Sequence, residues 1–537
     1  MTFPENARDS RRELTSLLVA WAILAAVTIV VAQQNLSVPG FYYDEALFGG
    51  LAKDFITGQA RLHLPGYEVV NFLGRPLPIF ASIYNGAWKC WVLIPAIALF
   101  GSSVAVLRLT SLLVALLTLL LFMLGVRRWL GLRAAMVAGL VLIVDPTYFF
   151  QSLLDWGVLI NSLLCRCGAF YLALIWWRNR KAGYLFLAAF LLGLGVFNKV
   201  DSVAFLVAVG IAAACFYGAQ LWAEVRARLT IVVICCGGFL LGAGPMTLQV
   251  LHIVQGVLAG KASSGSGEQS EKLHTILSMY DGSYFYRLMD VGGLFANMYA
   301  QPAGVYSLFG FFVFIAIGAL FTIALFAGDK NESRIAGFLL LSFALTTVFV
   351  FLVPGAVRIH HVAQVFPIPQ LIISAAFTFL WSTGPTIGVR RVTRIALLIS
   401  MLALLTSQAR AILKTEKLLN DTGGRGLWST AFDAFCRENR HRSDLVMISL
   451  DWGFNEQLAF LTEAQLVEPF WKFTDALPPL PNGPENVYLA HALEYSVFGA
   501  DTFYLNRLQM RAENAEIQPF RNREGRIIFY TIRFRVQ

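Results

Sequence analysis

Tyr42-Tyr-Asp-Glu-Ala-Leu-Phe-Gly-Gly-Leu-Ala-Lys53 follows shortly after the first long apolar segment of the chain, residues 15–32. It places two adjacent carboxylates, Asp44 and Glu45, at the mouth of that segment. Both come at the start of a predicted helix, where the positive end of the helix dipole favours negative side chains. The stretch therefore predicts a functional surface just outside a membrane.

The composition of the chain indicates a membrane protein with several spans. Of its 537 residues, 57% are hydrophobic and 14% are charged, whereas soluble domains average about 25% charged residues. The net charge of +9 does not indicate nucleic-acid binding, because the basic residues lie between apolar segments rather than on one face. The seven cysteines show no spacing typical of a disulfide framework or of a Cys/His metal site.

About eleven apolar segments are long enough to cross a membrane. They cover residues 15–32, 103–125, 134–150, 157–177, 183–198, 200–218, 229–252, 303–327, 335–353, 362–382 and 394–410. The basic residues gather in the N-terminus and in alternate connections, at Arg8/Arg11/Arg12, Arg127/Arg128/Arg133, Arg178/Arg180/Lys181, Arg226/Arg228, Lys330/Arg334 and Arg390/Arg391/Arg394. The positive-inside bias predicts that these lie in the cytoplasm. The segments expected on the other side are 33–102, 253–302, 354–361 and everything after about 411.

The predicted fold is an all-α polytopic membrane bundle over residues 1–410, followed by a small extracytoplasmic domain of α/β or α+β type over 411–537. The first outer loop, 33–102, is expected to lie partly in the membrane interface as short helices. The C-terminal part becomes rich in charge and contains short β-rich runs at 445–450, 487–490 and 526–535. Arg521–Gly525 reads as a hairpin turn, and Thr422–Gly426 as the link between the domains.

Asp44 and Glu45 are the first candidates for chemistry. An adjacent acidic pair on a loop is often only solvated, or caps a helix. Here aromatic residues surround the pair, and Gly49-Gly50 follows, which allows another segment to approach closely. A carboxylate in such a place can accept a proton from a hydroxyl or orient it.

Arg75, in Gly74-Arg75-Pro76, is the second candidate. The prolines around it fix an extended backbone, which leads into an amphipathic helix. An arginine there can simply extend to the lipid headgroups. Alternatively, its guanidinium group can bind a phosphate group through bidentate hydrogen bonds.

Charged residues at membrane depth form a third group, because they are costly there and by default suggest function. Asp155 is expected on the same outer side as Asp44. Arg166 lies inside a predicted span, and Lys199 lies at a turn, where it can pair with Asp201. The sequence Leu-Asp-Trp-Gly occurs at 154–157 and again at 450–453, which is too short a repeat to indicate duplication.

Arg358, His360 and His361 lie in a short outer loop and form a candidate anion-binding group. Metal binding by the histidines is an alternative, but no third ligand has a diagnostic spacing. The sequence contains no Walker A motif, no dinucleotide-binding fingerprint and no cytoplasmic domain able to hold a nucleotide sugar. A glycosyl donor used on the outer side would therefore be carried by the membrane.

Several of these motifs match one known pattern in chain order: Asp44–Phe48 through Gly58, Gly74–Leu77, Phe100–Arg108, Asp155, Phe197–Lys199, and His360-His361 with Pro367 and Pro369. Over residues 15–380 the chain resembles the GT-C membrane glycosyltransferases. The nearest branch is that of the protein O-mannosyltransferases, aminoarabinose transferases and core-polysaccharide galacturonosyltransferases. Two departures are Arg75 in place of the usual lysine, and Val200-Asp201 in place of Gly-Pro.

The resemblance implies an inverting transferase that moves a sugar from a polyprenyl-phosphate donor to a hydroxyl of a glycan, lipid or protein acceptor. It implies Asp44, Glu45 and Asp155 as catalytic residues, and Arg75, Arg358, His360 and His361 as ligands of the donor phosphate. Lys199 and Arg166 are expected to be structural or substrate-binding. A divalent metal is not obligatory, since the leaving group is a lipid phosphate. The expected location is a bacterial inner membrane.

The alternatives belong to other functional classes. A transporter or flippase for a lipid-linked or anionic solute would also use charges inside the membrane. It is expected to show paired halves with broken helices, which the sequence does not display. A receptor-like binding protein would not require about eleven spans with embedded charges.

Overall fold

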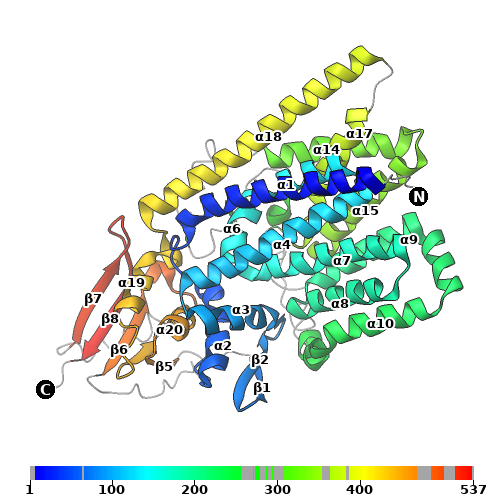
Figure 1. The fold of residues 1–537 in the computed structure, drawn as a ribbon. Coiled ribbons are helices and arrows are strands. Elements are labelled where there is room, and N and C mark those ends of the chain that lie inside the picture. Colours follow the sequence, from blue (N-terminus) through cyan, green and yellow to red (C-terminus); the bar gives the residue numbers. More distant parts are fainter. Residues whose placement is uncertain are drawn as a thin grey trace.

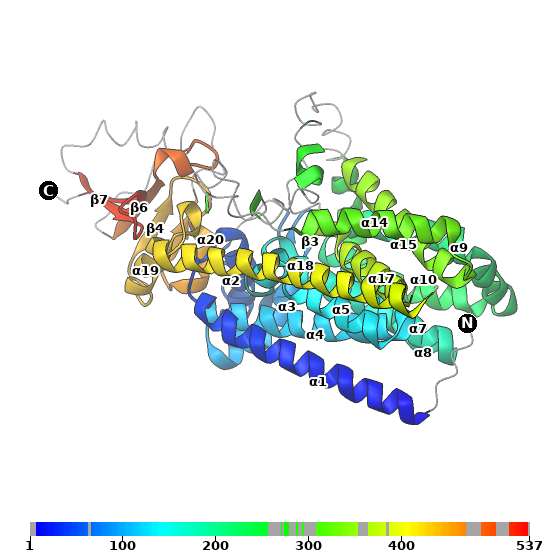
Figure 2. The same ribbon diagram turned by 90° about the horizontal axis from the view of Figure 1, so that it is seen from above.

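The computed structural model describes residues 7–62, 66–255, 270, 273–278, 286–287, 293–294, 308–352, 363–382, 386–468, 485–500 and 515–534. The chain forms a helical bundle with a small sheet domain at one end (Figure 1). The N-terminal end of the first helix lies at the opposite end of the bundle from that sheet. In Figure 2 this helix runs along one flank of the bundle.

Eight of the described helices are long and apolar enough to cross a membrane. They are α1 (Ala7–Ala32), α4 (Val104–Leu130), α7 (Leu159–Asn179), α9 (Ser202–Ala227), α10 (Thr230–Ala243, extended by further turns to Gln255), α14 (Phe309–Phe326), α15 (Lys330–Leu352) and α18 (Ile387–Thr422). Shorter apolar helices are α3 (Trp88–Phe100), α8 (Ala182–Asn198) and α17 (Ile368–Ser382). Within the described residues, the predicted apolar segments fall on these helices or on the bent pair described next, which confirms the polytopic bundle.

The predicted span 134–150 is not one straight helix. It consists of α5 (Leu132–Ile143) and α6 (Pro146–Leu154), which are bent by 66° to one another. Between them, the side chain of Asp145 accepts hydrogen bonds from the backbone N–H groups of Thr147 and Tyr148. A side-chain cap followed by proline at the first helical position starts a new helix, which explains the break.

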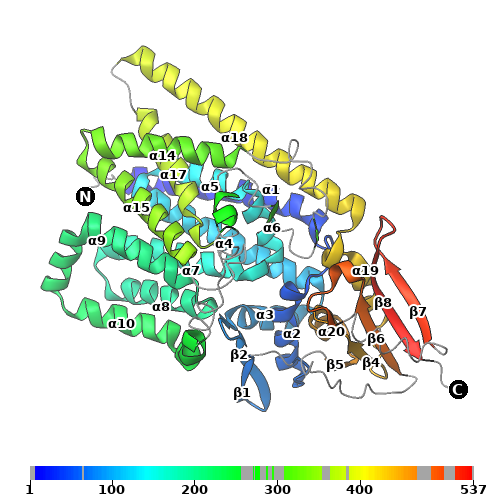
Figure 3. The ribbon, with the colours of Figure 1, turned by 180° about the vertical axis from the view of Figure 1, so that it is seen from behind.

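The first outer segment contains more β structure than the sequence predicted. It forms α2 (Tyr43–Thr57) and an antiparallel sheet of β1 (Glu68–Phe72), β2 (Arg75–Ser82) and β3 (Asn85–Gly86), followed by α3. The β1–β2 hairpin projects from the body beside α2 and α3 (Figure 3). Its turn is Leu73-Gly74, and both residues have positive φ. The prolines of β2 did produce the expected extended backbone, but its pairing partner was not recognised.

The C-terminal domain follows α18, which ends at Thr422. It contains α19 (Thr430–Glu438), α20 (Asn455–Leu461) and five strands: β4 (Val446–Ser449), β5 (Gln465–Val467), β6 (Asn486–His491), β7 (Ala515–Arg521) and β8 (Ile527–Phe534). The strand order is β5-β4-β6-β8-β7. Strand β4 is parallel to β5 and β6, and β8 is antiparallel to its neighbours. This confirms the small mixed domain and the β7–β8 hairpin turn.

Helix α2 joins the two parts of the molecule. A Cβ atom on Gly49 would come within 2.7 Å of Leu107 on α4 and 3.0 Å of Phe460 on α20. On Gly50 it would come within 2.8 Å of Leu62. Such distances are below those of real Cβ contacts, so the Gly-Gly step permits the close packing that the sequence suggested. The N-terminal end of α2 is thereby fixed between the bundle and the C-terminal domain.

Candidate active site

The N-terminal turn of α2 presents Asp44 at the junction of the two domains. The indole N–H of Trp156 donates a hydrogen bond to Asp44 Oδ2 over 2.8 Å. Asp44 is half-buried, whereas Tyr42 and Tyr43 before it are buried. The ring of Tyr42 stacks on Trp428 with centroids 4.2 Å apart. A carboxylate that is held by a donor and still partly accessible is suited to meet a substrate hydroxyl.

The loop that carries Trp156 is held in an unusual backbone conformation. Asp155, Gly157 and Val158 have φ values of 39°, 72° and 53°. Positive φ is unfavourable for a β-branched residue such as valine. Sparsely populated conformations of this kind persist where surrounding contacts enforce them, and they cluster at functional sites.

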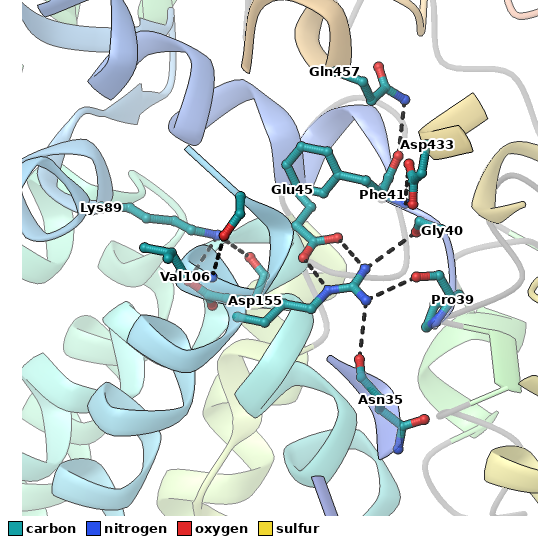
Figure 4. Close-up of polar contacts among 12 residues, drawn as sticks. Asn35, Pro39, Gly40, Phe41, Glu45, Lys89, Val106, Asp155, Asp433 and Gln457 are labelled. Carbon is teal, nitrogen blue, oxygen red and sulfur yellow. Dashed lines mark hydrogen bonds and ion pairs between the residues drawn. The ribbon is translucent and has the colours of Figure 1, made fainter. Parts of the chain in front are cut away.

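Asp155 supplies much of that enforcement. Its side chain is fully buried, and it accepts hydrogen bonds from the backbone N–H of Ile160 over 2.7 Å and from the Asn161 amide over 2.6 Å. Lys89 on α3 lies 3.3 Å from Asp155 Oδ2 and donates to its backbone oxygen over 3.0 Å. Figure 4 shows this pair. Asp155 thus anchors the loop that positions Trp156, and Trp156 in turn holds the carboxylate of Asp44 through its indole N–H.

Lys199 approaches the same loop from the turn between α8 and α9. Its ammonium group donates to the carbonyl of Gly157 over 3.3 Å and lies 3.7 Å from Asp201. It is also close enough to Asp44 for the two charges to interact. The structure therefore gathers Asp44, Asp155 and Lys199 at one end of the bundle, although they are far apart in sequence.

Glu45 faces away from this group and into the protein. Both of its oxygens accept hydrogen bonds from Arg108, over 2.8 and 3.0 Å, and both side chains are fully buried. Arg108 also donates to the backbone oxygens of Asn35, Pro39 and Gly40. Figure 4 shows Glu45 among these backbone groups. The ion pair ties α4 to the first turn of α2, and the bonds to backbone oxygens tie α4 to the segment that precedes α2.

The C-terminal domain also binds the segment that precedes α2, through Asp433 on α19. Both carboxylate oxygens of Asp433 accept from the backbone N–H of Phe41, over 3.1 and 3.0 Å, and Gln457 donates to the carbonyl of Phe41. Burial raises the pKa of Asp433 to about 7. Figure 4 shows Asp433 and Gln457 beside the backbone of Phe41.

A large apolar cavity lies between helices of the bundle. Its volume is about 700 Å³, and α7, α8, α9, α10, α15 and α17 contribute most of its wall. Arg166 is the single charged residue among those lining it. Arg166 donates to the carbonyls of Gln364 and Phe366, and its charge interacts with those of Asp201 and Lys199. The polar end of the cavity therefore adjoins the turn that carries Lys199.

Arg75, among the described residues, is not part of this group. Arg75 is exposed at the start of β2 and donates to the carbonyl of Ile56 over 2.7 Å. Arg358, His360 and His361 lie outside the described residues. Within the described ranges, no group of three or more His, Cys, Asp or Glu side chains is arranged to hold a metal ion.

Sequence reasoning did not identify Lys89, Arg108 and Trp156 as members of the site. Lys89 carried a signal, because it is a lone cation at the start of the apolar helix 88–100. Trp156 and Arg108 carried little, since tryptophan and arginine are common at the ends of membrane helices.

Comparisons with known proteins agree with the fold. Residues 88–240 match the family model described as dolichyl-phosphate-mannose-protein mannosyltransferase. The structure resembles that of ArnT from Cupriavidus metallidurans bound to undecaprenyl phosphate, with a TM-score of 0.55 and 14% identity over 95% of this chain and 97% of that one. For ArnT in the apo state, the TM-score is 0.53 and the identity 13% over the same shares.

A further match is the oligosaccharyltransferase of Archaeoglobus fulgidus tethered with an acceptor peptide, with a TM-score of 0.51 and 14% identity over 94% of this chain and 69% of that one. No curated protein sequence matches the chain. The resemblance to the GT-C fold that the sequence suggested is thus confirmed.

Proposed function

We propose that the chain is an integral-membrane glycosyltransferase that moves a sugar from a polyprenyl-phosphate donor to an acceptor hydroxyl on the extracytoplasmic face, with inversion. The observation that carries the proposal is the half-buried carboxylate of Asp44, held by Trp156 at the junction of a GT-C bundle and its C-terminal domain. A positioned carboxylate at such a junction suits general-base catalysis.

The donor class is supported by two kinds of observation. The description of the matching family model names a dolichyl-phosphate-linked mannose, and the similar ArnT structure is bound to undecaprenyl phosphate. This chain also has an apolar cavity of about 700 Å³ with Arg166 at its polar end. An isoprenoid chain has no polar groups, so its burial in such a wall is favourable by the hydrophobic effect.

In the proposed reaction, Asp44 accepts the proton of the acceptor hydroxyl. The hydroxyl oxygen forms a bond to the anomeric carbon of the donor from the face opposite the phosphate. The bond between that carbon and the phosphate oxygen breaks, and its electron pair leaves with the polyprenyl phosphate. Cationic groups near the leaving phosphate stabilise the charge that grows on it. Lys199, whose charge interacts with that of Asp44, is a candidate for this role.

The other candidates receive different roles in this proposal. Asp155 is a positioning residue that acts through Trp156, and Glu45 holds the backbone before α2 through Arg108. Arg75, Arg358, His360 and His361 remain candidate ligands of the donor phosphate. No divalent metal is required for this reaction, because the departing group is a single phosphate.

We further propose a bacterial inner membrane, with the N-terminus in the cytoplasm and the C-terminal domain outside. The orientation is supported by the basic residues in alternate connections of the sequence, which the positive-inside bias would place together in the cytoplasm. The N-terminal end of α1 and the C-terminal sheet lie at opposite ends of the bundle (Figure 1). That arrangement is consistent with this orientation.

The test uses the purified full chain in lipid nanodiscs with a panel of undecaprenyl-phosphate sugars and hydroxyl acceptors. Transfer is measured as the appearance of glycosylated acceptor together with free undecaprenyl phosphate. The rival function, transport of a lipid-linked solute, is tested in proteoliposomes with the same donors. Movement of the intact donor between leaflets without cleavage would overturn the proposal, whereas cleavage coupled to acceptor glycosylation supports it.

A further inference from the structure

The second Leu-Asp-Trp-Gly sequence folds into a loop that faces the start of α2 from the C-terminal domain. Asp451 is fully buried and accepts hydrogen bonds from the backbone N–H groups of Val497, over 2.9 Å, and Phe498, over 3.0 Å. Trp452 packs against Tyr43, with ring centroids 4.6 Å apart. The loop is therefore anchored by its aspartate, as the loop of Asp155 is.

Each of the two loops provides a tryptophan whose indole N–H donates a hydrogen bond to a carboxyl group. Trp156 donates its indole N–H to Asp44, and Trp452 donates its indole N–H to Glu456 on α20. Helix α20 packs against α2, and the charge of Asp44 acts on Glu456. The C-terminal domain thus adds a second indole-bound carboxyl group beside the first.

Glu456 has few partners for a buried acid. Its exposed fraction is 1%, Oε1 accepts from Trp452, and Oε2 has no hydrogen-bond partner among the described residues. An ionised carboxylate buried in this way is costly, whereas the protonated form has only a neutral polar group to bury. The negative side chains of Glu468 and Asp44 add to the cost. Burial, followed by the charge of Glu468, raises the pKa of Glu456 to about 8.

Other charged groups surround α20. Those on the elements packed around it include Asp44, Lys53 and Asp54 on α2, Arg61 after α2, Asp433 on α19, Asp451 on the loop before it, Glu463 and Glu468 after it, and His491 on β6. Arg61 pairs with Asp54 and donates to the carbonyls of Ala459 and Thr462 at the far end of α20. Lys53 donates to the carbonyls of Phe460 and Thr462 at the far end of α20, and burial lowers its pKa to about 7. Burial also lowers the pKa of His491 to about 4. Neither group neutralises Glu456 at alkaline pH.

We propose that Glu456 is a positioning residue of the transfer site, which keeps its proton beside Asp44 and so leaves Asp44 as the base that meets the acceptor. This inference rests on the proposed function. When Glu456 ionises, a second negative charge stands near Asp44, and binding of the negatively charged donor weakens. The C-terminal domain then contributes a pH-sensitive group to the site, in addition to covering it.

The experiment measures binding of undecaprenyl phosphate to the full chain in nanodiscs as the pH rises from about 7 to about 9.5, across the ionisation of Glu456. Glu456→Gln keeps an oxygen for the Trp452 hydrogen bond and cannot ionise. We expect affinity of the unmodified chain to fall about tenfold more than that of Glu456→Gln, from the repulsion of nearby like charges. The exposed neighbour Glu463 gives the control Glu463→Gln, which should behave like the unmodified chain.

A second variant tests the same point in the opposite direction. Glu468→Gln removes a negative charge that favours the proton on Glu456. Its loss lowers the pKa of Glu456, so the fall in affinity should begin at lower pH. An infrared titration follows the proton directly. Both proteins should lose the C=O band of protonated Asp433 near pH 7, and only the unmodified chain should lose a second carboxylic-acid band at higher pH.

The outcomes separate this inference from the proposed function. If undecaprenyl phosphate does not bind the unmodified chain at neutral pH, the proposed function fails, and the inference falls with it. If the lipid binds and Glu456→Gln retains the full alkaline loss of affinity, only the inference is overturned. An infrared spectrum with Glu456 ionised at neutral pH would also overturn it.

Discussion

The indole nitrogen of Trp156 lies 2.8 Å from a carboxylate oxygen of Asp44, although the two residues are 112 positions apart in the chain. The contact joins the start of α2 to the loop before α7. That loop is fixed by Asp155, which is itself paired with Lys89. The buried contacts of Lys89, Asp155 and Trp156 therefore fix the orientation of the partly accessible carboxylate of Asp44.

Asp44→Asn should remove transfer while leaving the protein folded and inserted. The amide keeps the shape of the side chain and can still accept from Trp156, but it cannot take a proton. General-base catalysis contributes about 10²–10⁴-fold, so transfer should fall by at least about 10². Glycosyl transfer and size-exclusion profiles of the purified variant check this. Normal activity would remove Asp44 from the mechanism.

Trp156→Phe should lower transfer by about tenfold, because a hydrogen bond to a charged group contributes about 1.5–3 kcal/mol. The phenyl ring preserves much of the packing of Trp156, so thermal stability should change little. Trp381→Phe, far along the bundle on α17, serves as a matched control. Equal kinetics in Trp156→Phe and the control would mean that the indole N–H does not position Asp44.

Glu45→Gln should mainly reduce stability. It leaves Arg108 as a buried cation without its counter-charge, and breaking a buried ion pair costs about 3–5 kcal/mol. The double variant Glu45→Gln with Arg108→Met should recover part of that loss. Thermal unfolding of the detergent-solubilised protein measures both. Asp444→Asn, which breaks an exposed ion pair with Arg442, should leave the Tm unchanged.

A different result for Glu45 would reassign it. If Glu45→Gln unfolds at the same temperature as the unmodified chain but transfers no sugar, Glu45 acts on substrate directly. The sequence prediction of Glu45 as a catalytic residue would then hold in its original form.

Ala213→Phe should weaken binding of undecaprenyl phosphate, because residue 213 lines the apolar cavity and the added ring would occupy its space. Ala214 is the next residue on α9 and is exposed, so Ala214→Phe adds the same ring outside the cavity. We expect at least about a tenfold loss of affinity for the first variant, the size of a few lost methylene contacts, and none for the second. Equal affinities would mean that the lipid chain lies elsewhere.

Arg75→Ala should weaken use of the donor more than Arg75→Lys, if Arg75 binds the donor phosphate as the sequence suggests. Lysine keeps the positive charge but not the planar geometry that allows bidentate hydrogen bonds. The KM for an undecaprenyl-phosphate sugar measures the difference. Since Arg75 is exposed at the β1–β2 hairpin, neither variant should unfold the protein. Indistinguishable KM values for both variants would count against a phosphate role.

Much of the architecture could be predicted from local sequence. The spans follow from apolar runs, and the C-terminal strands follow from short β-rich runs next to turn residues. The break at Asp145-Pro146 had a local signal too, since a capping residue followed by proline starts a helix. The β1–β2 pairing was missed because prolines within a strand normally argue against a paired strand.

The candidate site, too, has features that local sequence predicts and features that only tertiary packing decides. The sequence by itself singled out Asp44 and Asp155 as candidates, because acidic residues beside apolar segments are costly and therefore conspicuous. Only the tertiary structure turned Glu45 toward Arg108, aimed Trp156 at Asp44, and brought Glu456 from the C-terminal domain to the same place. Hydropathy depends on neighbours in the chain, whereas these contacts depend on which surfaces pack together. A hydrogen bond over 2.8 Å between residues 44 and 156 leaves no periodic trace in the sequence.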